Sequence, residues 1–487
     1  MNQKLLFFSL LFFALLVRLY RFDNPIADWH SWRQADTSSV SRNFVNRGFD
    51  IFHPRFDDLS NVPSGLDNPN GYRFVEFPIY NIAQAGLYSL FKFLTIEEWG
   101  RLVSIFSSLF SIVFLYLLVL RHGNKRVAFL CAFLFAFFPY NVYYSRTILP
   151  DPSMVMAILG GIYFFDVWIN QSAKLKSQNA KQQFKTQSFF ILSILFTAAA
   201  FLLKPYALFF TLPMLYLLWS KWKFTAFLKW QLYVFAIFCI LPFVGWRLWE
   251  AKFPEGIPVN SWLLNGNGIR FKPAFFRWMV YERLTKLILG YVGVLPFVLG
   301  LFKSFTAKER GFYISFLVSS LLYVCVFATG NVQHDYYQIL IMPTVAITTA
   351  LGAWFLLEVL QKKMHRVVAY GFLTALIFTM FYFSWRTVKD YFNINNPANV
   401  KAGIAVDRLT PKNAKVLALY DGDTSLLYQT KRQGWASFEK SLPEMIKMGA
   451  SYMILMHPKP WDDTFGNQYK ILEKTKEYMI VDLTKKP

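Results

Sequence analysis

The sequence predicts an α-helical polytopic membrane protein with about eleven spans, helices in its extracytoplasmic loops and a small C-terminal α/β domain. Three observations predict this fold class. The 487 residues are 55% hydrophobic and only 16% charged, whereas soluble domains carry about 25% charged residues. Uncharged runs, each close to the roughly 20 residues that cross a bilayer, recur along most of the chain. After residue 399, short apolar strands alternate with helical segments instead.

The first apolar run, residues 5–17, is expected to remain as a membrane anchor. Arg18 and Arg21 follow it, in place of the small residues of a signal-peptide cleavage site. Lys204 and Pro205 interrupt two later runs, so a miscounted hairpin there would move only that pair of spans. Ten further spans are expected near residues 102–120, 127–145, 152–169, 188–204, 206–219, 231–249, 284–302, 311–329, 339–357 and 367–385.

Basic residues predict the orientation of these spans. Lys and Arg total 51 against 29 Asp and Glu, a net charge of +22. Short loops on one side hold sixteen of the bases, whereas short loops on the other side hold Arg146 and Lys204 only. Positively charged loops are typical of the cytoplasmic side of a membrane protein. The excess of basic residues is therefore explained by orientation in a lipid bilayer, and a nucleic-acid partner is not predicted. The sixteen are Arg121, Lys125, Arg126, Lys174, Lys176, Lys181, Lys185, Lys221, Lys223, Lys229, Lys303, Lys308, Arg310, Lys362, Lys363 and Arg366.

This orientation predicts three large extracytoplasmic pieces, residues 21–98, 250–283 and 386–487. The first has ten acids against seven bases in an otherwise basic chain, which makes it a candidate for chemistry. We therefore expect a transmembrane domain over 1–385, with 21–98 as its catalytic loop, and an extracytoplasmic α/β domain over 386–487.

The tail is expected to alternate strands with helices. Asp421, Gly422, Asp423 and Thr424 follow the first strand and open a helix, where α/β domains often bind ligands; a turn glycine with a helix cap is the simpler alternative. Strands are expected at 415–420, 452–456 and 478–483, and helices at 423–430 and 439–449.

Three polar segments outside the membrane carry candidate residues. Asp36 is expected to start a helix along the membrane surface, with a helix cap as its simple alternative. Asp151 precedes Pro152 between two spans and could also cap a helix. His334 lies in a loop without Lys or Arg, alternatively as an interfacial residue. With Arg146 they share one side of the membrane, which suits a reaction between a lipid-borne phosphate ester and a hydroxyl.

The order of these residues resembles the GT-C glycosyltransferases of the family 39 type, which include protein O-mannosyltransferases and lipid A aminoarabinose transferases. The resemblance covers roughly residues 1–385. It implies transfer of a sugar from a polyprenyl-phosphate donor to a hydroxyl of a glycolipid, polysaccharide or protein on the extracytoplasmic face. The residues that carry it are Asp36, Arg42 through Gly48, Pro54, Glu76-Phe77-Pro78-Ile79-Tyr80, Arg146 through Asp151, Lys204-Pro205, and His334 through Tyr337 to Pro343.

The resemblance implies that Asp36 orients or deprotonates the acceptor hydroxyl and that Asp151 lines the same cavity. Arg146 would help to neutralise phosphate. Thr37 stands where the group commonly has a second acid, which weighs against a metal-assisted variant, although a divalent metal stays open as a cofactor. Phe77 replaces a lysine that meets the carrier phosphate in some members. Other groups must then bind the substrate, and the candidates are Arg33, Arg73, Glu76, Lys204, Arg270, Lys272, His334 and Tyr337.

Two other functions compete with this interpretation. A lipid-linked glycan flippase or transporter would place ionisable residues near mid-membrane, whereas Asp166, Arg247, Lys286 and Glu358 lie close to span ends. A structural membrane protein with an extracytoplasmic binding domain gives no reason for the acids of the first loop. Arg270 and Lys272 could instead face solvent or lipid headgroups. The basic loops, without a retrieval or lipidation motif, predict a bacterial inner membrane. The three cysteines all lie in apolar runs without metal-ligand spacing.

Overall fold

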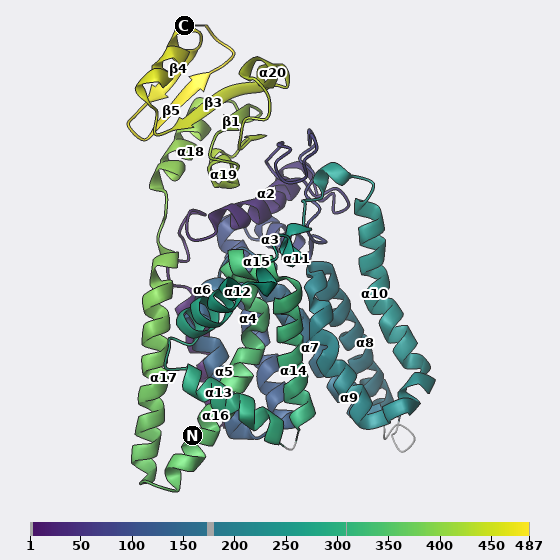
Figure 1. The fold of residues 1–487 in the computed structure, drawn as a ribbon. Coiled ribbons are helices and arrows are strands. Elements are labelled where there is room, and N and C mark those ends of the chain that lie inside the picture. Colours follow the sequence, from purple (N-terminus) through teal and green to yellow (C-terminus); the bar gives the residue numbers. More distant parts are fainter. Residues whose placement is uncertain (1–2, 173–179, 308, 487) are drawn as a thin grey trace.

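The computed structural model describes residues 3–172, 180–307 and 309–486. A bundle of long helices forms most of the molecule, and a small sheet stands at one end, opposite the N-terminus (Figure 1). Of the bases that predict the orientation, Lys174, Lys176 and Lys308 lie outside the described residues.

Within residues 3–172, 180–307 and 309–486, six helical stretches are long and apolar enough to cross a membrane. The chain is therefore a multi-pass membrane protein, as predicted, while the total of eleven spans stays a prediction. Two shorter apolar helices, α13 (Val294–Thr306) and α14 (Arg310–Val326), stand beside them. The six stretches are α4 (Ile96–His122), α7 (Asp151–Ser172), α8 (Ala180–Leu203), α10 (Trp230–Glu250), Asp335–Gln361 with α16 (Met342–Gln361), and Arg366–Leu409 with α17 (Arg366–Val388) and α18 (Pro397–Leu409).

Several expected spans are broken, and prolines account for two of the breaks. Pro139 begins a new helix and divides the span expected at 127–145. Pro205 separates α8 from a 3-10 turn, which confirms the interruption at Lys204. Because proline has no N–H and fixes φ, it ends one helix and suits the first turn of the next. The remaining pieces are α1 (Gln3–Arg18), α5 (Lys125–Phe137), α6 (Pro139–Tyr144), α9 (Leu212–Trp222), a π-helix (Arg277–Ile288) and α15 (Ala328–Gln333).

Helices in the loops lie between the bundle and the sheet (Figure 1). The most buried of them is α2 (Ser31–Arg47), which starts five residues before Asp36. Asp36 therefore lies inside the helix, and its interpretation as a helix cap or helix start is wrong. His30 begins the helix instead, with a φ of 56°. The other loop helices are α3 (Ile79–Leu90), α11 (Trp262–Asn265) and α12 (Pro273–Phe276).

The C-terminal sheet has five strands in the order β2-β1-β3-β5-β4. β1 pairs in parallel with β2 and β3, while β5 is antiparallel to β3 and β4. The three expected strands are confirmed, but β2 and β4 were not predicted because one is very short and the other half-exposed. The elements are β1 (Lys415–Ala418), α19 (Thr424–Thr430), β2 (Gln433–Trp435), α20 (Leu442–Lys447), β3 (Ala450–Met456), β4 (Lys470–Lys474) and β5 (Tyr478–Asp482).

The sheet domain, residues 397–486, is docked on the first large loop through its edge strand. Gly434 of β2 donates its N–H to Asp57 O over 3.0 Å and accepts from Leu59 N–H over 2.7 Å. A Cβ at Gly434 would lie 1.8 Å from Val416 O, so only glycine fits between β1 and the loop. The loop thereby continues the sheet by one short bridge.

Candidate functional site

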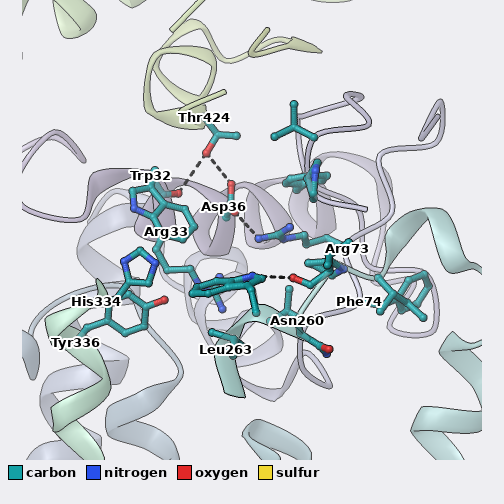
Figure 2. Close-up of a pocket in the computed structure, with 18 of the residues that line it drawn as sticks. Trp32, Arg33, Asp36, Arg73, Phe74, Asn260, Leu263, His334, Tyr336 and Thr424 are labelled. Carbon is teal, nitrogen blue, oxygen red and sulfur yellow. Dashed lines mark hydrogen bonds and ion pairs between the residues drawn. The ribbon is translucent and has the colours of Figure 1, made fainter. Parts of the chain in front are cut away.

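A cavity of about 830 Å³ opens where α2, the loop around Arg73, the segment around Asn260, the turn before α16 and the start of α19 meet. Figure 2 shows that the side chains in it come from both the bundle and the sheet domain. Six residues of the predicted set line this cavity, namely Arg33, Asp36, Arg73, Lys204, His334 and Tyr337.

Asp36 is held at both carboxylate oxygens. Arg73 Nη2 donates to Oδ2 over 2.5 Å, and the Thr424 hydroxyl donates to Oδ1 over 2.7 Å (Figure 2). The side chain is 3% exposed, and its helix places it on the wall of the cavity. An ionised carboxylate has about four lone-pair sites, so these two donors leave Asp36 able to accept from a substrate hydroxyl.

Arg33 and Glu76 form a buried ion pair one turn before Asp36. Arg33 Nη2 donates to both Glu76 oxygens over 2.9 and 3.1 Å. Burial alone would raise the pKa of Glu76, but Arg33 and then Lys204 outweigh it and lower that pKa. Glu76 is therefore ionised at neutral pH and orients the guanidinium that lines the cavity.

Lys204 follows α8 and lines the same cavity. Its Nζ lies 3.7 Å from Asp151 Oδ2, an ion pair longer than a hydrogen bond. Neither Asp151 oxygen has a hydrogen-bond partner within the described residues, although both are buried. Asp151 is the first residue of α7 and is not among the residues that line the cavity, in contrast to the position that the resemblance implied; its ion pair with Lys204 links it to the cavity.

Aromatic rings form the wall beside Arg33. The rings of His334 and Tyr336 stack with centroids 5.5 Å apart, and Tyr337 stacks on Tyr336 at 4.7 Å. Burial, with a contribution from His30, lowers the pKa of His334 to about 4. His334 is therefore neutral near pH 7 and offers one hydrogen-bond donor without a charge.

Three of the predicted cations lie away from the cavity. Arg146 is fully buried and donates to Asp28 Oδ2 over 2.8 Å and to Arg21 O over 2.6 Å. Arg270 donates to Val326 O over 3.0 Å, and Lys272 donates to Asn267 O over 2.9 Å. These three side chains are therefore used in contacts with backbone oxygens and with Asp28, away from the cavity. The sequence could not show this, because it does not reveal which way a basic side chain in a loop points.

The sequence reasoning missed one residue near the site, Asp335, and it missed the contact of Thr424 with Asp36, although it named Thr424 in a ligand-binding turn. Asp335 follows His334 and accepts from His30 Nε2 over 2.6 Å. Thr424 reaches Asp36, whereas its neighbour Asp423 caps α19 by accepting from Ser425 N–H over 2.7 Å. The cap alternative for the turn is thus confirmed at Asp423. An acid in a loop without bases was the available signal for Asp335.

Comparisons with known proteins bear on the fold of the chain. Residues 76–246 match the family described as dolichyl-phosphate-mannose-protein mannosyltransferase. No curated protein matches the chain. Among solved structures, the fold is similar to that of ArnT from Cupriavidus metallidurans bound to undecaprenyl phosphate, with a TM-score of 0.66 and 12% identity over 99% of this chain and 98% of that one.

A second group of structures shares the fold. An Archaeoglobus fulgidus oligosaccharyltransferase tethered with an acceptor peptide gives a TM-score of 0.62 at 10% identity, covering 93% of this chain and 69% of that one. AglB from the same organism, in complex with an inhibitory peptide and a dolichol-phosphate, gives 0.58 at 11% identity over 98% and 74%. At such identities the structures show a common fold.

Proposed function

We propose that this chain, which is a membrane glycosyltransferase of the GT-C fold as its ordered residues predicted, transfers a sugar from a polyprenyl-phosphate donor to an acceptor hydroxyl. Asp36 is the carboxylate that receives the proton of that hydroxyl. One observation supports this most directly: Asp36 keeps free lone pairs on the wall of a cavity that also contains the cations Arg33 and Lys204.

Arg33 and Lys204 are the groups that hold the phosphate of the donor. Phe77 cannot bind the phosphate, since its side chain has no charge and no hydrogen-bond donor. Its ring packs edge-on against Trp246 instead, with centroids 4.9 Å apart. Within the described part of the chain, Lys204 Nζ has the loose ion pair with Asp151 and lies 5.9 Å from the centre of the Tyr206 ring. Neither contact is a hydrogen bond, so its ammonium hydrogens are available to a phosphate. The similar structures of ArnT bound to undecaprenyl phosphate and of AglB in complex with a dolichol-phosphate support a donor of the same class.

The reaction is a single displacement at the anomeric carbon. The acceptor oxygen forms a bond to this carbon as the bond to the phosphate oxygen breaks, and the acceptor proton passes to Asp36. The leaving phosphate is weakly basic, so cations at the phosphate help more than a proton donor. Arg73 and Thr424 orient Asp36, while Arg33 and Lys204 stabilise the charge that develops on the phosphate.

We place the cavity and the domain over 386–487 on the extracytoplasmic side of a bacterial inner membrane. The basic loops predict a cytoplasmic N-terminus. The N-terminus lies at the end of the bundle opposite the sheet (Figure 1), which supports an extracytoplasmic sheet domain. The donor tail then lies among the helices, with its phosphate at the cavity.

Mass spectrometry of polyprenyl lipids tests the donor. Cells that lack the protein are complemented with wild type, Asp36→Asn or Asp67→Asn, the last a control in an exposed acid of the same loop. We expect a polyprenyl-phosphate sugar to accumulate without the protein and to be cleared by wild type and Asp67→Asn only. Its mass identifies the sugar. An identical lipid pool in all strains contradicts the assignment of the donor.

A second assay separates transfer from transport. The accumulated lipid is incubated with purified protein in detergent and a membrane extract as the source of acceptor. A transferase releases polyprenyl phosphate there, whereas a flippase has no second leaflet to move lipid into. We expect release by wild type and none by Asp36→Asn.

A further inference from the structure

The first turn of α19 brings a residue of the sheet domain to the carboxylate of Asp36. Thr424 Oγ1 lies 2.7 Å from Asp36 Oδ1 and 3.3 Å from Trp32 O, and both of these atoms are acceptors. A hydroxyl has one proton, so it goes to the nearer and charged oxygen. Figure 2 shows Thr424 on one side of Asp36 and Arg73 on another.

We propose that the sheet domain completes the active site, with Thr424 as a positioning residue that fixes the Asp36 carboxylate. This inference rests on the proposed role of Asp36. Arg73 holds Oδ2 and Thr424 holds Oδ1, so the carboxylate cannot rotate about its bond to Cβ. The lone pairs that remain on the two oxygens are then fixed in direction, and one of them can accept from the acceptor hydroxyl.

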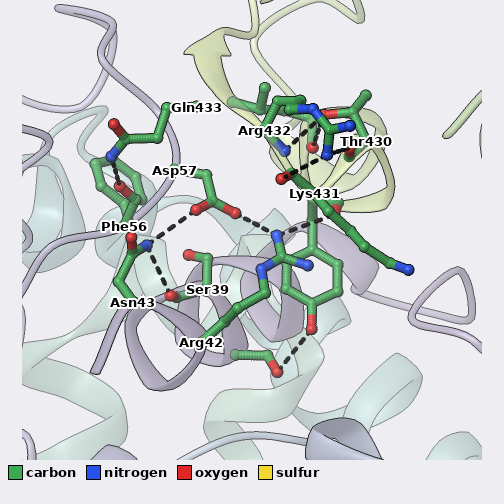
Figure 3. A network of polar contacts seen from close by, with 12 residues as sticks. Ser39, Arg42, Asn43, Phe56, Asp57, Thr430, Lys431, Arg432 and Gln433 are labelled. Atoms are coloured by element: carbon green, nitrogen blue, oxygen red, sulfur yellow. Dashed lines mark hydrogen bonds and ion pairs between the residues drawn. The ribbon is translucent and has the colours of Figure 1, made fainter. Parts of the chain in front are cut away.

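A second set of contacts, made by Arg42 of α2 and Tyr428 of α19, holds α19 over α2. Arg42 donates to Asp57 and to Tyr428 O, and its guanidinium lies 3.9 Å from the centre of the Tyr428 ring. The Tyr428 hydroxyl donates to Glu97 and lies 3.0 Å from Ser38 Oγ. Figure 3 shows the contact of Arg42 with Asp57 in this network, together with residues 430–433 of the sheet domain.

Both contacts come from one face of α19. Thr424 and Tyr428 are four residues apart on α19, and side chains four apart share one face of a helix. Their partners Asp36 and Arg42 are six residues apart on α2, so the docked α19 contacts two separate positions on that helix. A threonine held in this way can position a catalytic group within a fraction of an ångström.

The sheet domain also forms part of the cavity wall. The cavity is lined from the sheet domain by Asp421, Gly422, Asp423 and Thr424. Removal of the domain would open the cavity on that side and leave Asp36 with Arg73 as its partner. The site is therefore incomplete without residues more than 380 positions away in the chain.

Three variants test the role of the hydroxyl. Thr424→Val keeps the shape of the side chain and removes the donor, whereas Thr424→Ser keeps the donor. Thr430→Val is the matched control, because Thr430 lies on the same helix and donates to Leu427 O instead. Turnover is measured as release of polyprenyl phosphate from the lipid that accumulates in cells lacking the protein.

We expect Thr424→Val to lower kcat about tenfold to a hundredfold, as for a lost hydrogen bond to a charged group, with an unchanged KM for the donor lipid. Thr424→Ser should restore most of the loss, and Thr430→Val should match wild type. Wild-type kcat in Thr424→Val, or equal losses in the Val and Ser variants, would overturn the proposal while leaving the activity of wild type as support for the proposed function.

A thermal double-mutant cycle tests the contact without any substrate. Tm is measured for wild type, Thr424→Val, Asp36→Ala and the double variant. If the hydroxyl binds Asp36, Thr424→Val lowers Tm in the wild-type background and has a smaller effect beside Asp36→Ala. Additive shifts would contradict the contact, even if the donor lipid turned out to be misassigned.

Discussion

Two buried carboxylates, Asp36 and Asp335, are used by the fold in opposite ways. Their exposures are 3% and 1%. Asp36 accepts from two side chains and lines the cavity, so part of its hydrogen-bonding capacity is free. Asp335 accepts from four side chains and has Arg283 at 3.8 Å. Its donors are Trp29 Nε1, His30 Nε2, Tyr144 OH and Tyr391 OH.

This difference suits Asp36 to the proposed proton transfer and Asp335 to a structural role. A carboxylate with about four lone-pair sites and four donors cannot take a proton without losing native contacts. The donors to Asp335 come from three separate segments of the chain, so this residue ties the N-terminal loop to α6 and to the 3-10 helix Lys389–Phe392 that follows α17. Burial alone therefore does not mark a catalytic acid, whereas burial with unused acceptor capacity beside a cavity does.

The largest expected effect is that of Asp36→Asn on turnover. An amide cannot receive the acceptor proton, so release of polyprenyl phosphate should fall about 10³-fold, within the usual range for a lost general base. Tm should change by only a few degrees, because the Asn oxygen still accepts from Thr424. Turnover above a tenth of wild type would contradict the assignment and remove the contrast with Asp335.

Asp335→Ala should give the opposite pattern. Four donors lose their acceptor in a buried site, which should lower the free energy of unfolding by about 3 kcal/mol. Thermal unfolding in detergent measures this loss, and Tyr391→Phe, which removes one donor, should cost about 1 kcal/mol. A variant with the wild-type Tm but no turnover would place Asp335 in the chemistry instead.

The basic residues also differ in how fully their contacts are used, and Lys204→Met tests this difference. Lys204 has a loose ion pair at 3.7 Å, whereas both Nη atoms of Arg146 donate, to Asp28 and to backbone oxygens. Loss of one charged contact to phosphate should lower kcat/KM for the donor lipid about tenfold to a hundredfold. Lys272→Met changes the charge equally outside the cavity and should match wild type. Equal losses in both variants would point to a general effect of charge.

The sequence predicted the class of fold better than its interruptions. Apolar runs show where helices can cross a membrane, but they do not show that Pro139 divides one of them. The start of α2 was misplaced because His30 adopts a left-handed conformation while its ring binds Asp335, a contact between segments 305 residues apart. The strand β2 is three residues long, too short for any alternating pattern.

Part of the site could be predicted from residue type and from the predicted side of the membrane alone. Asp36, Arg33 and Lys204 reach one cavity because topology places their segments at the same end of the bundle. Arg270 was wrongly grouped with them, since a charge in a loop does not reveal which way it points. The pairing of Thr424 with Asp36 spans 388 residues and has no local signal. Tertiary packing decided both.

Asp58, a third buried acid, gives the smallest effect and lies between the two extremes. It lines the cavity and accepts from Ser60 N–H over 3.0 Å and from Ser60 Oγ over 2.7 Å. Burial raises its pKa from 3.8 to about 7, with Asp36 adding to the rise and Ser60 opposing it. Between these pH values the folded protein keeps a proton that the unfolded chain has lost, so stability should fall as pH rises from about 4 to about 7.

The slope of this decline is at most about 1.4 kcal/mol per pH unit, the value for one proton. Asp58→Asn does not titrate, so its Tm should lose this decline and exceed that of wild type above pH 7. Asp67→Asn alters an exposed acid and should keep the wild-type slope. If Asp58→Asn kept the slope as well, the proton would belong to another group, and Asp58 would join Asp335 as a carboxylate fully satisfied by its donors.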